Sequence, residues 1–219
     1  TNGTSWSYLG VAPVKATGNG FGPITPDGKV TMLMIAPKPP YLIRRCVSPD
    51  GARTWEKTNG SVDTIVGNIT FPVTKLNPLG EFQGCVKPDA CSVIQMSTLV
   101  LQDGSYLLFA YARVTRYADD AEGRRWGTRG GGKLPNGMVF CIRSTDHGLS
   151  WSAPINLDRN TSTVGTWQLP KGLPPGNEVS ASQTRSGEIV AFVRAETSPL
   201  MWEGRGSSNG LLWQPMARG

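Results

Sequence analysis

The sequence has little charge, almost no histidine and no long apolar run. Charged residues make up 17% of its 219 residues, and His147 is the single histidine. No apolar stretch approaches the roughly 20 residues of a membrane-spanning helix, so we expect no membrane span. The four cysteines include one closely spaced pair, and the lack of a second such pair or of a His cluster argues against a zinc site. We therefore expect no metal and no cofactor.

The charge that is present is mainly basic and scattered along the chain. A net charge of +6 is compatible with an acidic partner such as an anionic sugar. Neither a stripe of aromatic and basic residues nor a nucleic-acid-binding motif occurs in the sequence, so we expect no nucleic-acid partner. The 27 glycines and 17 prolines favour many turns and short strands over long helices.

Several features are typical of a secreted or extracellular protein. Four glycosylation sequons begin at Asn2, Asn59, Asn68 and Asn160. The sequence begins with Thr1 in place of a methionine, which leads us to expect a processed or excised piece of a longer protein.

The cysteines fall into two groups with different expected states. Cys85 and Cys91 are close enough in sequence to close a small disulfide loop. Cys46 and Cys141 lie in predicted strands just before two of the recurring turns described next. We expect both to be buried thiols, because free cysteine is among the most buried residue types.

One short segment occurs three times in the chain. The residues SPDGARTW (48–55) and STDHGLSW (144–151) share a serine, an acid, a tight turn and a tryptophan. The residues GSSNGLLW (206–213) form a degenerate third copy. Such recurrence indicates one structural unit that is used several times.

We predict a structural role for these turns. Their defining residues are Ser48, Asp50 and Trp55 in the first copy and Ser144, Asp146, Gly148 and Trp151 in the second. The acid can accept backbone N–H bonds within the turn, the glycine allows a positive φ, and the tryptophan can pack between sheets. Ser208 replaces the acid in the third copy, so we expect that turn to be weaker.

Each recurring turn has an upstream companion, a glycine turn followed by an apolar strand. The glycines are Gly28, Gly104 and Gly187, and the predicted strands cover 29–36, 105–113 and 188–194. From the glycine to the acid position there are 22 residues in the first copy (50 − 28) and 21 in the third (208 − 187). The 42 residues in the second copy (146 − 104) imply an insertion, which fits the loop-like segment 122–137.

These units together predict an all-β fold. Each repeat contains a strand before the glycine turn, a strand after it, a strand leading into the recurring turn and a strand leaving that turn. Four-stranded antiparallel sheets repeated along a chain are the blades of a β-propeller. The expected blades cover about residues 8–57, 92–155 and 177–215 of a single domain spanning 1–219.

The recurring turns resemble the Asp boxes, or BNR repeats, of the sialidase (neuraminidase) superfamily. The resemblance implies a propeller of six blades, of which this chain holds three to four, with the remaining blades outside it. Asp boxes occur in catalytic and in non-catalytic proteins. The turns therefore imply a fold and not an activity.

A second segment resembles the part of sialidases that carries catalytic and substrate-binding residues. In NEVSASQTRSGEIVAFVR (177–194), Glu178 precedes Arg194 by 16 residues (194 − 178). In the family, this glutamate is the base that activates a tyrosine nucleophile, and the arginine is one of three that bind the substrate carboxylate. Glu178 and Arg194 lie equally far from Ser186, so a hairpin turning there makes them cross-strand neighbours, at the end of the sheet opposite the Asp boxes.

Further candidates follow the second predicted strand. The resemblance implies Asp119, or else Asp120, as the acid/base residue. The candidate substrate-binding residues are Arg113 and Trp126. Arg113 stands at the end of the second predicted strand, and Trp126 has arginines on both sides in the sequence. The chain also departs from the family, because no arginine occurs at positions 94–96, where the first of the three carboxylate-binding arginines should fall.

The leading functional hypothesis is part of a secreted sialidase-like glycoside hydrolase that cleaves terminal acidic sugars with retention of configuration. The tyrosine nucleophile and the third arginine are expected beyond Gly219, so we expect this piece alone to be inactive. One alternative is a non-catalytic Asp-box propeller that binds glycans or proteins. Another is a propeller hydrolase of neutral polysaccharides, which would need a pair of essential carboxylates.

Overall fold

All regular elements of the described structure are β-strands. The computed structural model describes residues 22–37, 40–57, 61, 63–70, 91–114, 137–157, 176–195, 201–214 and 217–218. No helix occurs within these residues, and none that could span a membrane is found there. The all-β prediction is confirmed.

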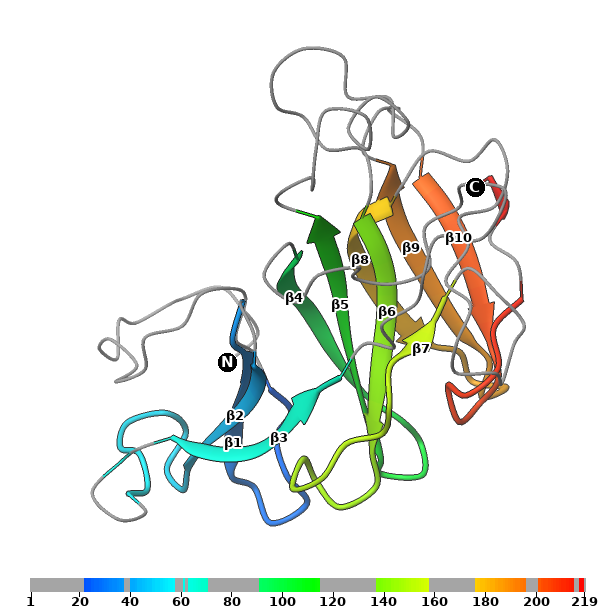
Figure 1. Ribbon diagram of the computed structural model, residues 1–219. Helices are drawn as coiled ribbons and strands as arrows, with labels where there is room; N and C mark the ends of the chain where they lie inside the picture. Colours follow the sequence, from blue (N-terminus) through cyan, green and yellow to red (C-terminus); the bar gives the residue numbers. More distant parts are fainter. Residues whose placement is uncertain are drawn as a thin grey trace, which may run out of the picture.

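The strands form three antiparallel sheets, which follow one another along the chain (Figure 1). The first sheet contains β1 (Val30–Ile35), β2 (Tyr41–Ser48) and β3 (Thr64–Ile69). The second contains β4 (Cys91–Val100), β5 (Tyr106–Val114), β6 (Gly137–Ser144) and β7 (Ile155–Asn156). The third contains β8 (Gly176–Gln183), β9 (Ile189–Ala195), β10 (Met201–Gly206) and β11 (Ala217–Arg218).

Within each sheet the strands pair in chain order. The described part of the first sheet has three strands, and the second and third sheets have four each. Of the strand expected before Gly28, the described residues show an isolated antiparallel bridge from Ile24 to Val30. After the first Asp turn, the Glu56 N–H donates to the Val47 carbonyl (2.8 Å), and the next strand of this sheet is Thr64–Ile69, so the sheet extends beyond the predicted range 8–57.

The second sheet is buried on both faces, which explains why its strand β5 is almost uniformly apolar. Because side chains alternate across a strand, Leu108 and Ala110 point toward the first sheet, whereas Leu107 and Phe109 point toward the third. The core between the first two sheets consists of Leu33, Ile35, Tyr41, Ile43, Ile69, Val93, Leu108, Ala110, Phe140 and Ile142. The core between the second and third includes Leu107, Phe109, Val139, Cys141, Val179, Ile189, Ala191, Val193, Trp202 and Trp213.

Cys46 and Cys141 are buried free thiols, as predicted from the sequence. Burial raises the pKa of the Cys141 thiol to about 12 and that of the Cys46 thiol to about 11, because the thiolate is poorly solvated there. Both groups therefore stay protonated and unreactive near neutral pH.

The second and third sheets are aligned with their turns at the same end. The backbone N–H of Gln102 donates to Oε1 of Gln183 (2.7 Å), and the Gln102 side-chain amide donates to the Thr184 carbonyl (3.0 Å). These bonds join the glycine turns of the two sheets. The Asp turns lie at this same end, which we call the turn end. At the opposite end, the far end, β5 stops at Val114, β6 and β8 begin, and β9 stops at Ala195.

Candidate functional site

The first two Asp turns contain the same hydrogen-bond network. The Ser48 hydroxyl donates to Oδ1 of Asp50 (2.9 Å), and Asp50 accepts bonds from the backbone N–H and the hydroxyl of Thr54 (2.7 Å each). In the second turn, Asp146 accepts bonds from the hydroxyl of Ser144 (2.7 Å) and from the backbone N–H (2.8 Å) and hydroxyl (2.5 Å) of Ser150. Each carboxylate therefore closes its own turn.

These bonds hold both carboxylates in the ionised form. The backbone N–H and hydroxyl of Thr54 lower the pKa of Asp50 to about 2. Burial of Asp146 works against ionisation, but the bonds from Ser150 outweigh it and hold the pKa of this carboxyl at about 2. A carboxylate that is saturated with hydrogen bonds and so weakly basic is poorly suited to proton transfer near neutral pH.

The third turn keeps its place in the sheet but shifts its polar network by one residue. Gly206 pairs with Ile189 just as Ser144 pairs with Tyr106, so Ser208 stands at the acid position, as the sequence indicated. The acceptor is nevertheless Asn209, whose Oδ1 receives bonds from the Ser207 hydroxyl (2.7 Å) and the Leu211 N–H (3.1 Å). The neutral side-chain amide of Asn209 thus accepts the hydrogen bonds of this turn, as the aspartate does in the other two.

The tryptophan of a turn packs on the preceding sheet. Trp213 is fully buried, and its ring meets Phe109 edge-on, with the ring centroids 6.0 Å apart. Trp151 packs against the core between the first and second sheets. Trp55, at the corresponding place in the first sheet, is only half-buried. The Asp turns therefore connect neighbouring sheets and belong to the scaffold.

Glu178 and Arg194 meet at the far end of the third sheet. The Arg194 guanidinium Nη1 lies 3.1 Å from Oε1 of Glu178. A bulge in β8 between Gly176 and Val179 places two residues, Asn177 and Glu178, opposite Arg194. Bulges re-aim side chains and are frequent beside functional sites. The predicted cross-strand proximity of the two side chains is confirmed, while their chemical roles stay predictions.

Four further side chains share the sheet face of this ion pair. Residues directly opposite each other in a ladder point to one face, and Met201 lies opposite Arg194, while Glu203 and Ser180 lie opposite Phe192. Phe192 and Met201 are exposed. The alternation of buried Ile189, Ala191 and Val193 along β9 is a sequence signal that would have identified Phe192 as an outward residue.

The other predicted site residues lie mostly outside the described residues. This holds for Asp119, Asp120 and Trp126, for Cys85, and for the sequon residues Asn2, Asn59 and Asn160. Arg113 lies in β5, opposite Ser92 and Gly137 at the far end of the second sheet. Cys91 is the first residue of β4. Asn68 is exposed on β3.

Gln95 is the middle one of the three positions, 94–96, at which the resemblance to sialidases implies the first arginine. It lies opposite Ala110, which belongs to the core between the first and second sheets. The Gln95 side chain is fully buried, and neither its Oε1 nor its Nε2 has a hydrogen-bond partner among the described residues. This amide therefore faces the first sheet, whereas the ion pair lies on the side of the third sheet that faces away from the second.

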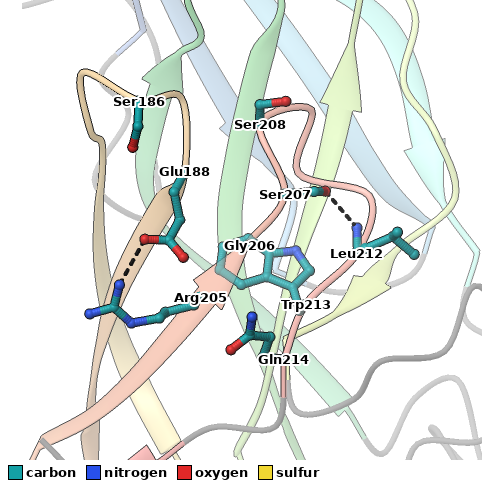
Figure 2. Close-up of a pocket in the computed structure, with 9 residues that line it drawn as sticks. All are labelled: Ser186, Glu188, Arg205, Gly206, Ser207, Ser208, Leu212, Trp213 and Gln214. Atoms are coloured by element: carbon teal, nitrogen blue, oxygen red, sulfur yellow. Dashed lines mark hydrogen bonds and ion pairs between the residues drawn. The ribbon is translucent and has the colours of Figure 1, made fainter.

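A shallow hollow of about 410 Å³ lies at the turn end of the third sheet, away from the ion pair (Figure 2). Arg205 lines it together with Glu188, Ser207, Leu212 and Gln214. The Arg205 guanidinium is bonded to Glu188 (2.7 Å) and to Glu203 (2.6 Å). Two carboxylates thus neutralise this arginine, so the hollow is a poor anion site.

Comparison with known proteins finds only distant likenesses. No protein-family model matches the chain, and no curated protein sequence matches it. Similar solved structures include a protein of unknown function from Dyadobacter fermentans (17% identity, TM-score 0.43, 89% of this chain and 66% of that one). An α-L-arabinanase from Penicillium chrysogenum, complexed with arabinobiose, is also similar (15% identity, TM-score 0.48, 90% of this chain and 47% of that one). A third is the intramolecular trans-sialidase from Ruminococcus gnavus, in complex with oseltamivir carboxylate (12% identity, TM-score 0.38, 97% of this chain and 73% of that one).

The chain therefore spans 66% of the first of these proteins and 47% of the second. At these identities and TM-scores the likenesses do not identify an activity.

Proposed function

We propose that this chain is part of a secreted, sialidase-like glycoside hydrolase with a β-propeller fold, and that Glu178 and Arg194 contribute to its glycan site. The observation that carries the proposal is their ion pair of 3.1 Å, on two strands that meet at the far end of the third sheet. Binding residues held on a rigid scaffold opposite its connecting turns are typical of sites built on repeated sheets.

The exposure of the pair supports a role in binding more than in stability. The side chains of Arg194 and Glu178 are 58% and 53% exposed, and ion pairs in water stabilise a fold by only about 0–1 kcal/mol. A ligand carboxylate can approach this guanidinium from solvent and form two parallel charge-assisted bonds. An acidic terminal sugar carries such a carboxylate.

The resemblance to sialidases supplies the proposed chemistry. Arg194 holds the sugar carboxylate, and Glu178 takes the proton from a tyrosine hydroxyl as that oxygen attacks the anomeric carbon. The glycosidic C–O bond breaks, and Asp119 or Asp120 gives its proton to the leaving oxygen. A water then loses a proton to that aspartate and attacks the same carbon, the bond from this carbon to the tyrosine oxygen breaks as Glu178 returns its proton, and the sugar leaves with its configuration retained. The tyrosine is assigned to no residue of this chain.

Glycan binding without hydrolysis is the second candidate function. It is favoured by the absence of an arginine from positions 94–96, where the resemblance implies one, and by the buried neutral amide of Gln95 among them. A site with fewer arginines binds a carboxylate less tightly and orients it less well for reaction. On this proposal Arg194 and Glu178 would bind the terminal sugar but would not assemble a complete catalytic set.

A glycan array and a hydrolysis assay test both candidates. We expect this chain to retain glycans that end in an acidic sugar in preference to neutral ones. In the longer protein that carries this chain with its remaining blades, release of the fluorophore from a fluorogenic sialoside, lost in Glu178→Gln but kept in the matched control Glu188→Gln, would establish the hydrolase. Binding without release by that longer protein supports the second candidate. Retention of neutral glycans alone would refute the recognition of acidic sugars and favour a hydrolase of neutral polysaccharides.

A further inference from the structure

A hydroxyl of the second sheet is bonded to the strand that carries Glu178. The Ser97 hydroxyl of β4 donates a hydrogen bond of 3.2 Å to the backbone carbonyl of Val179 in β8. Val179 directly follows Glu178 in the chain. β4 and β8 are the first strands of their sheets, and they contact each other. The second sheet therefore holds the main chain of β8 next to the Glu178–Arg194 ion pair.

A bulge in β4 turns Ser97 toward this neighbour. Ser97 lies opposite Phe109 and Gln95 lies opposite Ala110, with Met96 as the extra residue between them. Partners in a ladder share a face, so Gln95 faces the first sheet and Ser97 faces the third. Without the extra residue, strict alternation would put Gln95 and Ser97 on the same face. The bulge thus directs the Ser97 hydroxyl at β8.

The main chain at Glu178 receives little support from its own sheet. The regular ladder of β8 and β9 runs from Gln183 to Val179, and beyond Val179 two residues of β8 stand opposite Arg194. A bulge of this kind leaves one residue of the strand without a partner in the ladder. In the described sheet, β8 is also an edge strand. The bond from Ser97 therefore fixes β8 at its last regular residue before the irregular part.

The side chains of Val179 and Glu178 point in opposite directions from this segment. Val179 is 4% exposed and belongs to the core shared with the second sheet, whereas Glu178 is exposed and reaches Nη1 of Arg194 at 3.1 Å. A rigid peptide unit joins the two residues, so a shift of the Val179 main chain moves Glu178 as well. Because β9 has a partner strand on either side, the position of Glu178 relative to Arg194 depends mainly on β8.

We propose that Ser97 is a positioning residue of the glycan site, whose hydroxyl fixes the β8 main chain so that Glu178 keeps its place beside Arg194. The inference rests on the proposed function for its ligand, an acidic sugar, but not for the geometry of the ion pair. Loss of the hydroxyl takes this donor away from the Val179 carbonyl and lets the segment shift. A ligand that needs the carboxylate and the guanidinium in fixed places then binds less tightly.

Two substitutions of the same shape test the proposal. Ser97→Thr keeps a hydroxyl donor for the Val179 carbonyl, whereas Ser97→Val removes it. NMR signals of the Arg194 guanidinium, assigned by their loss in Arg194→Gln, report the ion pair without any glycan. We expect Ser97→Val to shift these signals toward their positions in Glu178→Gln, and to weaken calorimetric binding of a sialylated oligosaccharide about fivefold. Ser97→Thr should match wild type in both measurements.

Gln102→Ala is the matched control, because it removes side-chain hydrogen bonds between the same two sheets at the turn end. It should lower Tm, as Ser97→Val does, but leave the guanidinium signals and the affinity unchanged. Circular dichroism verifies that every variant is folded.

Unchanged guanidinium signals or an unchanged affinity in Ser97→Val would overturn the proposal. Equal effects of Ser97→Val and Gln102→Ala on the ion pair would also overturn it, because the cause would then be a general loosening of the two sheets. A wild-type chain that binds no acidic sugar refutes the proposed function separately. In that case the guanidinium signals still support the positioning of the pair by shifting in Ser97→Val, or overturn it by staying unchanged.

Discussion

Arg194 lies opposite a two-residue bulge in β8, and its guanidinium is 3.1 Å from the Glu178 carboxylate within that bulge. The regular register of β8 and β9 already places Glu178 opposite Arg194. The extra residue of the bulge alters the local direction of β8 beside this pair. The Glu178 carboxylate and the Arg194 guanidinium, held together at an exposed end of the sheet, form the proposed glycan site.

The charge of Asp146 should make stability depend on pH in the acid range. Its folded pKa of about 2 lies below its ordinary value of 3.8. Its contribution is therefore fully present above about pH 4 and is lost as the pH falls through 2. Asp146→Ala should lower the free energy of unfolding by about 1–2 kcal/mol at neutral pH. Urea titrations between pH 2 and 7 measure both effects.

The neutral third turn provides the control for this prediction. Asn209→Ala removes the corresponding acceptor and should leave the steepness of the pH dependence unchanged. If wild type and Asp146→Ala lose stability in parallel between pH 4 and pH 2, the carboxylate has no such role.

Burial of the turn tryptophans predicts unequal costs for the same substitution. Trp213 is fully buried against Phe109, so Trp213→Ala should lower the free energy of unfolding by about 3–5 kcal/mol. Trp55 is half-buried, and Trp55→Ala should cost about 1–2 kcal/mol. Chemical denaturation of the two variants measures the difference, and equal losses would show that Trp213 does not hold the sheets together.

A left-handed backbone position in the Asp turns predicts opposite effects of exchanging glycine and alanine. Gly210 has φ of +70°, and a Cβ there would lie 2.5 Å from Cδ1 of Leu107, which is fully buried. Gly210→Ala should therefore cost about 2–4 kcal/mol. Ala52 has the same φ of +70°, and Ala52→Gly relieves strain of about 1 kcal/mol. In thermal melts the first should lower Tm and the second should not; a lower Tm for Ala52→Gly would count against this reading.

The sequon at Asn68 should accept a glycan in a eukaryotic secretory pathway. Asn68 is exposed on β3, an edge strand of the first sheet, so an oligosaccharyltransferase can reach its amide. Peptide mass spectrometry after treatment with a glycosidase that leaves aspartate at the modified site measures occupancy. Asn68→Gln should remove one glycan from the intact mass. An unmodified Asn68 peptide from secreted material would contradict the expectation.

The strands and the first two Asp turns were predictable because their signals are local. Apolar runs after Gly28, Gly104 and Gly187 became β1, β5 and β9, and the turn network forms from a serine two residues before an aspartate and a hydroxyl residue four after it. The hairpin at Ser186 likewise predicted that Glu178 and Arg194 would meet, because its register follows from counting residues on either side.

The remaining features depend on contacts that a motif does not encode. The third turn uses Asn209 because its polar network is displaced by one residue relative to its strand, and the motif alone pointed to Ser208. The bulge beside Glu178 and the burial of Gln95 have no local sequence signal either.

The most direct test of the proposed site is calorimetric titration of a sialylated oligosaccharide and of its neutral counterpart into three proteins. Wild type should prefer the acidic sugar, and Arg194→Gln should weaken its binding at least about tenfold. Arg205→Gln, which removes the other ion-paired arginine of the same sheet, should bind as wild type does. Equal affinity of wild type and Arg194→Gln for the acidic sugar, or no preference over the neutral one, would contradict the account.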